Sequence, residues 1–287
     1  MKIGILLRLA NRSLEEAMRE AAKLGVDGIQ LYVRHETYDL LAASPSARRA
    51  FRRRCCELNL ELPALCGEVG GHGFRVAAEN PAKIELMRRT LDLAHELECP
   101  VVSTHIGVIP ADPTDPVYGV MLEALATLGI DAKARAVTLA LETGPESPDV
   151  LKRFISQAGG GLGVNFDPAN LAMVQNSDAA EAARILGPHI VHVHAKDGIH
   201  CRDCDPARVY EAFAEGGFDR LVAETGELFR EVPLGEGQVD FPRCLAALRV
   251  SGYDGFLTIE REVGIDPERD MRLAVEFLRC QLELFPA

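Results

Sequence analysis

Residues 2–33 decide the fold and read KIGILLRLANRSLEEAMREAAKLGVDGIQLYV. The stretch begins with the apolar run KIGILLR, which is typical of a buried strand. Ser13 and Glu16 then have the spacing of a helix capping box, and apolar residues follow at helical intervals. Gly25 is placed to end that helix, and 28–33 reads as a second strand. The stretch therefore predicts a βα unit followed by the next strand.

The same alternation of a short apolar strand with an amphipathic helix recurs along the whole chain. Continuous apolar strands separated by helices predict a parallel sheet covered by helices, and eight such units favour a closed barrel. We therefore predict an α/β fold, a single (β/α)8 TIM barrel formed by one domain over residues 1–287. A doubly wound open sheet is the alternative, but no GxGxxG or P-loop motif follows the first strand. The eight strands are expected at 2–7, 28–33, 61–66, 100–105, 136–142, 162–167, 189–194 and 256–260.

Composition and charge limit the classes of function. The chain has 287 residues, of which 47% are hydrophobic and 26% charged, as in ordinary globular proteins. No apolar run is long enough to span a bilayer, and the N-terminus lacks the pattern of a signal peptide, which predicts a cytoplasmic protein without a membrane partner. The net charge of −12 argues against nucleic acid as a partner, because an acidic surface repels phosphate backbones.

The connection between the seventh and eighth strands is longer than the others. It contains the glycine-rich segment GEGQVDF, residues 235–241, and long loops in such barrels tend to cover the active site. It also contains Cys201 and Cys204, two of eight cysteines and the one pair with CxxC spacing. Without a second CxxC, we interpret both as reduced loop or packing cysteines, with a metal or redox role as the alternative.

Polar residues end five of the expected strands, at the edge of a barrel where catalysis takes place. They are His105, Glu142, Asp167, His194 and Glu260. Three carboxylates gathered at one edge would repel one another and raise one another's pKa values, and a divalent cation removes that conflict. The last four residues are therefore predicted to bind one ion; an oxygen-rich set favours Mn²⁺ or Mg²⁺, with Co²⁺ and Zn²⁺ as further candidates. The alternative is that each carboxylate pairs with a lysine or arginine.

Other polar residues lie near the same edge. His192 and His194 point to the same side of one strand, so His192 is expected inside the barrel as a packed or supporting residue. His105 is a candidate for substrate binding, with a core histidine as the alternative. Lys196 and Asp197 lie just past the strand end, where they contact either substrate or solvent.

The strand-end motifs resemble those of the xylose isomerase-like barrel superfamily of sugar isomerases and epimerases. The resemblance covers nearly the whole chain and rests on the order of the motifs ALETG, GVNFDPAN, HVHAKD, PLGEGQVDF and TIERE. It implies one metal ion held by Glu142, Asp167, His194 and Glu260. In ketose 3-epimerases of that superfamily, the two glutamates also move the substrate proton through an enediolate, which implies catalytic roles for Glu142 and Glu260.

Two positions depart from the epimerase pattern. Asn170 stands where epimerases have a histidine, and His200 stands where they have an arginine; both positions contact substrate in that subfamily. We predict a metal-dependent isomerase or epimerase of a small sugar or polyol, with His105, Asn170 and Lys196 as substrate-binding residues. The alternatives are a keto-polyol dehydratase, an endonuclease IV-like nuclease and a non-catalytic binding barrel. A homo-oligomer is compatible with the sequence.

Overall fold

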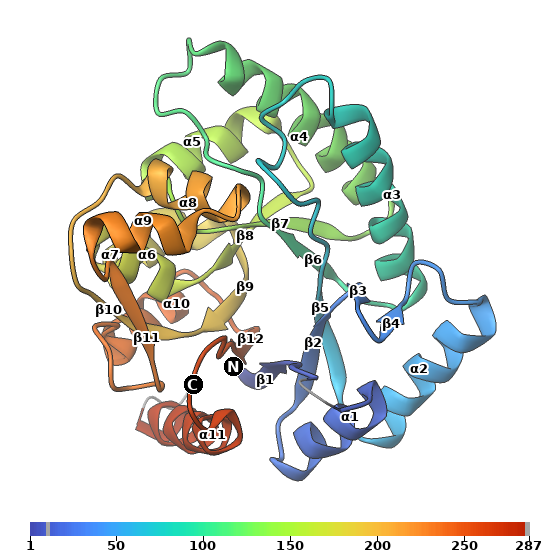
Figure 1. The fold of residues 1–287 in the computed structure, drawn as a ribbon. Helices are drawn as coiled ribbons and strands as arrows, with labels where there is room; N and C mark the ends of the chain where they lie inside the picture. Colours follow the sequence, from blue (N-terminus) through green and yellow to red (C-terminus); the bar gives the residue numbers. More distant parts are fainter. Residues whose placement is uncertain (10–11, 285–287) are drawn as a thin grey trace.

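Eight parallel strands close into a barrel in the computed structural model, which describes residues 1–9 and 12–284 (Figure 1). Going round the barrel, the strands follow chain order and the last pairs with the first, so the predicted (β/α)8 barrel is confirmed and an open sheet is excluded. The predicted domain also includes residues 10, 11 and 285–287, which lie outside the described residues. The barrel strands are Lys2–Leu6 (β1), Gly28–Tyr32 (β2), Glu61–Cys66 (β5), Val101–Thr104 (β6), Thr138–Glu142 (β7), Leu162–Phe166 (β8), Ile190–Ala195 (β9) and Phe256–Ile259 (β12).

Helices follow most barrel strands and cover the outside of the barrel (Figure 1). The predicted capping box is present at the first of them, where the Ser13 side chain accepts from the Glu16 backbone N–H and Glu16 accepts from that of Ser13. Within the described residues, no helix has the length and apolar content needed to cross a bilayer. The helices are Leu14–Lys23 (α1), Pro45–Glu57 (α2), Asn80–Glu96 (α3), Pro116–Ala134 (α4), Pro148–Ala158 (α5), Pro168–Gln175 (α6), Ala179–Leu186 (α7), Pro206–Ala214 (α8), Phe218–Thr225 (α9), Phe241–Val250 (α10) and Pro267–Leu284 (α11), with a 3-10 turn at Gly187–His189.

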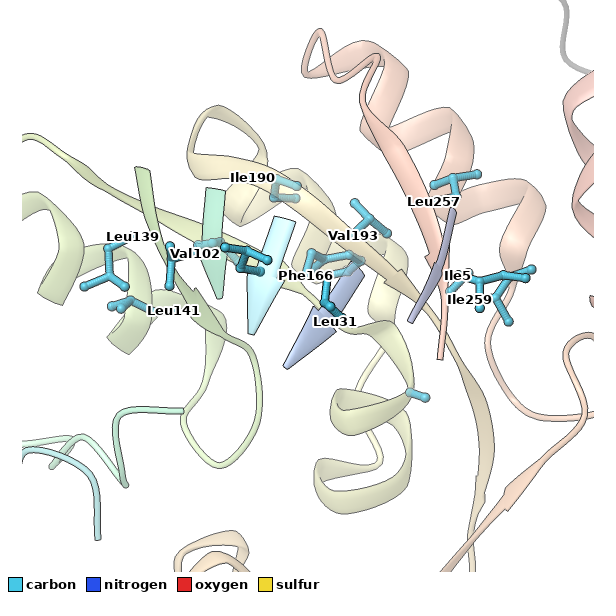
Figure 2. Packing of buried hydrophobic residues seen from close by; sticks show 14 of the residues in the cluster. Ile5, Leu31, Val102, Leu139, Leu141, Phe166, Ile190, Val193, Leu257 and Ile259 are labelled. Atoms are coloured by element: carbon cyan, nitrogen blue, oxygen red, sulfur yellow. The ribbon is translucent and has the colours of Figure 1, made fainter. Parts of the chain in front are cut away.

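The two faces of the barrel strands differ in chemistry. Large apolar side chains such as Leu139, Leu141 and Phe166 alternate along the strands and join the core shared with the helices (Figure 2). The positions between them are small or polar, among them Ala140 and Asn165, and these point into the barrel. Because the helices complete the apolar core outside the barrel, the inside is free to hold a polar site.

Two hairpins outside the barrel were not expected from the sequence. One joins Arg34–His35 (β3) to Tyr38–Asp39 (β4), and the other joins Asp197–His200 (β10) to Phe229–Val232 (β11). The second hairpin, with α8 and α9 between its strands, forms the long insertion after β9 (Figure 1). The long connection was expected to cover the active site, and residues of its α8, α9 and β11 do line the cavity at the carboxyl end of the barrel, whereas its glycine-rich segment 235–241 does not.

The glycine-rich segment is held in place by one buried carboxylate. Asp197 accepts backbone N–H groups from Gly198 (2.8 Å), Gly235 (3.0 Å), Gly237 (2.9 Å) and Val239 (3.1 Å). A side chain at Gly237 would collide with the Asp197 carboxylate, so the approach requires glycine. Asp197 was a candidate for substrate or solvent contact, and the structure gives it this supporting position instead.

Replacing Asp197 by alanine should therefore destabilise the protein. The change leaves four N–H groups without their acceptor, which we expect to lower the free energy of unfolding by about 3 kcal/mol. Urea unfolding in EDTA measures this, with Asp219→Ala, an exposed aspartate of α9, as the matched control. Equal losses in the two variants would contradict this role of Asp197.

Candidate metal centre

Four of the predicted site residues meet at the carboxyl end of the barrel. Glu142, Asp167, His194 and Glu260 each place one potential ligand atom within 4.8 Å of all the others, and all four side chains are buried. The Nδ1 atom of His194 lies 3.1 Å from a Glu260 oxygen, 3.4 Å from a Glu142 oxygen and 4.0 Å from an Asp167 oxygen. The sequence placed these residues at four successive barrel strands, and the closure of the barrel brings them together.

The electrostatics of the cluster fit a cation. Burial raises the pKa of Asp167 to about 8; Glu260 and Glu142 add to the rise and Lys196 opposes it. Burial lowers the pKa of His194, but the same two glutamates outweigh it and hold that pKa well above its usual value. A divalent ion would relieve the repulsion among the three carboxylates, and its ligands bind it in their deprotonated forms.

The two carboxylate oxygens of Asp167 have different surroundings. Its Oδ1 caps α6 by accepting the backbone N–H groups of Ala169 (2.8 Å) and Asn170 (3.0 Å). Its Oδ2 is buried without a hydrogen-bond partner among the described residues. An unsatisfied buried carboxylate oxygen is costly, so this atom is the clearest sign that the four residues fit a metal ion.

Gln30, which the sequence analysis missed, supports the imidazole from across the barrel. Its side-chain oxygen lies 3.0 Å from Nε2 of both His194 and His192, and its amide nitrogen donates to Cys66 Sγ and Ser103 Oγ. When Nε2 of His194 donates to Gln30, its Nδ1 is left free to face the three carboxylates. The signal was present, because Gln30 is a lone amide in an otherwise apolar strand.

Two amides hold the Glu142 carboxylate. Asn165 donates to one oxygen at 3.1 Å, and Asn170 donates to the other at 3.4 Å and to the Thr143 carbonyl at 3.2 Å. His105 Nε2 lies 3.7 Å from the same carboxylate, while its Nδ1 lies 3.1 Å from Glu68. Burial lowers the pKa of His105, but the Glu142 and Glu68 carboxylates raise it to about 10. His105 and Asn170 thus lie beside Glu142, as a substrate contact would require.

Lys196 is a buried cation next to Glu260. Its ammonium lies 3.2 Å from Glu260, 2.5 Å from Glu262 and 3.8 Å from Glu231. Glu231 belongs to β11 and also bonds Arg261 at 2.6 Å. The sequence left Lys196 in contact with either substrate or solvent. The solvent-exposed alternative is wrong, because the side chain is buried among carboxylates.

A cavity of about 770 Å³ opens above the cluster. Glu142, His194 and Glu260 line it, as do the three predicted substrate-binding residues His105, Asn170 and Lys196, whereas Asp167 does not. Its size is within the usual range for small-molecule sites.

Comparisons with known proteins agree with this geometry. A family model described as a xylose isomerase-like TIM barrel matches residues 18–281. The chain belongs to this family. The chain is 27% identical over 286 residues to L-ribulose-5-phosphate 3-epimerase UlaE of Escherichia coli strain SMS-3-5, covering 93% of this chain and 89% of the relative. The superfamily resemblance inferred from the strand-end motifs is thus confirmed, and this relative supports the predicted isomerase or epimerase.

Two solved structures share the fold. The xylose isomerase domain protein from Planctomyces limnophilus has a TM-score of 0.79 at 25% identity, covering 98% of this chain and 96% of that one. A xylose isomerase-like TIM barrel protein from Mycobacterium smegmatis, solved in complex with magnesium, has a TM-score of 0.68 at 20% identity, covering 93% of this chain and 87% of that one.

His200 and the CxxC cysteines lie apart from the candidate metal centre. The Nδ1 atom of His200 lies 2.8 Å from the Met173 carbonyl and its Nε2 lies 2.9 Å from Asp203, which holds the ring against α6 rather than in the cavity wall. Cys201 is exposed and Cys204 half-buried, and both are free thiols. The epimerase arginine position therefore carries a packing contact in this chain.

A further buried carboxyl group, outside the four-residue cluster, lies past the end of β7. Glu146 is 7% exposed, and its Oε2 has no hydrogen-bond partner within the part of the chain that the structure describes. Burial raises the pKa of Glu146 from 4.5 to about 8. The group does not line the cavity, so it serves below as a control for the metal-centre carboxylates.

Replacing Gln30 by methionine should weaken metal binding. The change keeps the length of the side chain but removes the acceptor for His194, which we expect to lower Mn²⁺ affinity about 10- to 100-fold. Titration calorimetry measures this, and Gln157→Met, at an exposed glutamine of α5, is the control. Unchanged Mn²⁺ affinity in a folded Gln30→Met protein would show that Gln30 does not position the imidazole.

We expect Glu146 to make the folded protein less stable as the pH rises. Between pH 4.5 and about 8 the unfolded state ionises this carboxyl group while the folded state keeps it protonated, so rising pH favours unfolding. Glu146→Gln removes this contribution. We expect the free energy of unfolding of the variant, relative to wild type, to increase from pH 5 to pH 8 and then level off. Chemical unfolding across this range checks it, and a pH-independent difference would contradict the raised pKa.

Proposed function

We propose that this chain is a divalent-metal-dependent isomerase or epimerase of a ketose or related polyol, in which Glu142 and Glu260 move a proton next to a carbonyl group. One observation carries the proposal. These two glutamates belong to the candidate metal centre and also line the cavity, which Asp167 does not. The relative named as an L-ribulose-5-phosphate 3-epimerase supports the same type of reaction.

The metal ligands in this proposal are Glu142, Asp167, His194 and Glu260. Three carboxylates and one imidazole suit Mn²⁺ or Mg²⁺, and Co²⁺ or Zn²⁺ are further candidates. The magnesium in the Mycobacterium smegmatis relative is consistent with such an ion. When bound, the ion supplies a Lewis acid that polarises the substrate carbonyl.

The protein side chains then divide the proton transfer. One glutamate removes the proton from the carbon next to the carbonyl, and the substrate becomes an enediolate. The other glutamate returns a proton, on the opposite face in an epimerase or to the neighbouring carbon in an isomerase. The ammonium of Lys196, 3.2 Å from Glu260, stabilises the negative charge that the enediolate develops beside that carboxylate. We propose that His105 and Asn170 bind substrate hydroxyl groups beside Glu142.

A keto-polyol dehydratase is the second candidate. Asn170 occupies the position where the epimerases have a histidine, and its amide is directed at Glu142. Dehydration begins with the same proton removal and then expels a β-hydroxyl group, so the candidate metal centre serves either outcome.

The remaining sequence-based inferences stay proposals. We propose that residues 1–287 form one domain, that the protein acts in the cytoplasm on a small molecule, and that nucleic acid is not a partner. We also propose that the protein can form a homo-oligomer. Cleavage of an oligonucleotide with an abasic site would identify the nuclease alternative.

Deuterium exchange tests the proposed reaction. We expect protein with about one Mn²⁺ per chain to incorporate deuterium next to the carbonyl of a free ketose, such as D-fructose or D-ribulose, in D₂O. Glu142→Gln and Glu260→Gln should each lower that rate by about 100-fold or more, because each removes one proton carrier. Nuclear magnetic resonance measures exchange, and elemental analysis measures the metal.

The control for this experiment is Glu146→Gln, which changes a buried carboxyl group outside the cluster and should leave exchange unchanged at pH 7. Exchange without loss of water supports an isomerase or epimerase, and loss of water identifies the dehydratase. Failure to bind any divalent metal, or full exchange in both glutamine variants, would refute the proposal.

A further inference from the structure

The wall of the cavity formed by the insertion is aromatic. Tyr210 and Phe213 of α8, Phe218 of α9 and Phe229 of β11 all line it. The rings of Phe213 and Phe218 stack with centroids 4.1 Å apart, and Phe229 lies 5.5 Å from Phe218. This aromatic wall, defined by Phe213, Phe218 and Phe229, lies in the long connection after β9, which was expected to cover the active site but not to be aromatic.

The aromatic wall is open to a ligand. Phe213 is 51% exposed and is the one aromatic side chain among the large exposed hydrophobic residues of the described chain. Val263, which follows β12, is 55% exposed and lines the same cavity. Exposed apolar surface inside a cavity gains free energy when a ligand covers it, and clustered apolar surface of this kind marks binding sites.

The insertion is fixed next to the candidate metal centre. Arg75, in the loop after β5, lies 3.4 Å from Glu211 of α8, and His72 of the same loop lies 3.7 Å from Glu215. The Tyr210 hydroxyl packs against Gly144, two residues past Glu142. The aromatic wall and the metal centre therefore belong to one cavity, with the metal centre at the barrel end and the aromatic wall on the insertion.

The charges of the cavity disfavour an anionic substrate. Its lysine and arginine residues already have carboxylate partners: Arg75 bonds Glu211, Arg230 bonds Glu227, and Lys196 lies among three glutamates. A phosphate group would have to displace one of these carboxylates and approach the others, which costs Coulombic energy. The cavity-lining carboxylates outside the candidate metal centre are Glu68, Glu211, Glu231 and Glu262.

We propose that the cavity takes an uncharged keto-polyol that carries an aryl or alkyl group on a carbon other than those next to its carbonyl, as in the aglycone on C1 of a 3-ketoglycoside. The inference rests on the proposed function, which places the carbonyl end at Glu142 and Glu260. The apolar group lies on the aromatic wall of Phe213, Phe218 and Phe229. The substrate thus differs from the sugar phosphate in the name of the Escherichia coli relative.

Binding of matched probes tests the substrate class. Titration calorimetry on Mn²⁺-loaded protein compares methyl and phenyl 3-keto-β-D-glucopyranoside, and D-ribulose with D-ribulose 5-phosphate. We expect the phenyl glucoside to bind about tenfold tighter than the methyl glucoside, because its ring covers apolar surface. The phosphate should add no affinity. In Phe213→Ala the ratio of phenyl to methyl affinity should fall toward about 1, since the variant loses the exposed ring.

The matched control is Ile130→Ala, which removes an exposed apolar side chain of α4 outside the cavity and should leave the affinity ratio unchanged. The proposal would be overturned if the wild type bound the two glucosides equally or bound neither, or if it bound the phosphate more tightly than D-ribulose. It would also be overturned if folded Phe213→Ala kept the wild-type ratio of phenyl to methyl glucoside affinity. If free ketoses exchange deuterium but the phenyl preference is missing, this inference alone fails. If the preference is present but exchange is not, the proposed reaction fails.

Discussion

The carboxylates of Glu142, Asp167 and Glu260 repel one another, and the contacts around them hold these three groups in place despite that repulsion. Each of the three is supported by a different neighbour: two amides hold Glu142, the start of α6 occupies one oxygen of Asp167, and Lys196 lies beside Glu260. These contacts fix the positions of the carboxylates but leave one oxygen of Asp167 unsatisfied. The architecture thus holds a costly arrangement of charge in place, as a site prepared for a cation would.

The barrel and the insertion make different contributions to the cavity. The barrel supplies charged residues on strands that pair with both neighbours, so their geometry is rigid. The insertion supplies the aromatic wall. It is attached through the packing of β10 and β11 against α6, the buried ion pair between Glu231 and Arg261, and the contact between Glu211 and Arg75. The part that performs chemistry can therefore stay constant while the insertion varies, and variation there would change substrate choice rather than reaction type.

The sequence predicted the barrel and its strand-end residues well because both depend on strong local signals. A buried parallel strand is a continuous apolar run, and a charged residue that ends such a run stands out; all eight strands lie within two residues of their expected bounds. The β10–β11 hairpin escaped prediction because its pairing joins Asp197–His200 to Phe229–Val232 across two intervening helices. Its register depends on tertiary contacts such as the buried Asp197, which no local pattern shows.

The role of Gln30 escaped prediction for a related reason. Its place in an apolar strand could be seen in the sequence, but its two histidine partners lie on β9, on the far side of β1 and β12 in the barrel order. The role of the glycines in the segment 235–241 was likewise hidden, because they allow the backbone to approach Asp197, a contact that the sequence pattern does not show.

The hydrogen bond between Gln30 and His194 also ties the early part of the chain to the late part, across 164 positions. With Glu260 directly after the last barrel strand, the site draws on nearly the full length of the polypeptide. The four predicted ligands all lie on or directly after the adjacent strands β7, β8, β9 and β12, but Gln30, which supports His194, comes from β2. A C-terminal half barrel would therefore hold the ligands without that support, and the supported imidazole forms only when β12 and β2 have both paired with β1. An ion that binds the supported site most tightly would favour the closed barrel over partial ones by mass action.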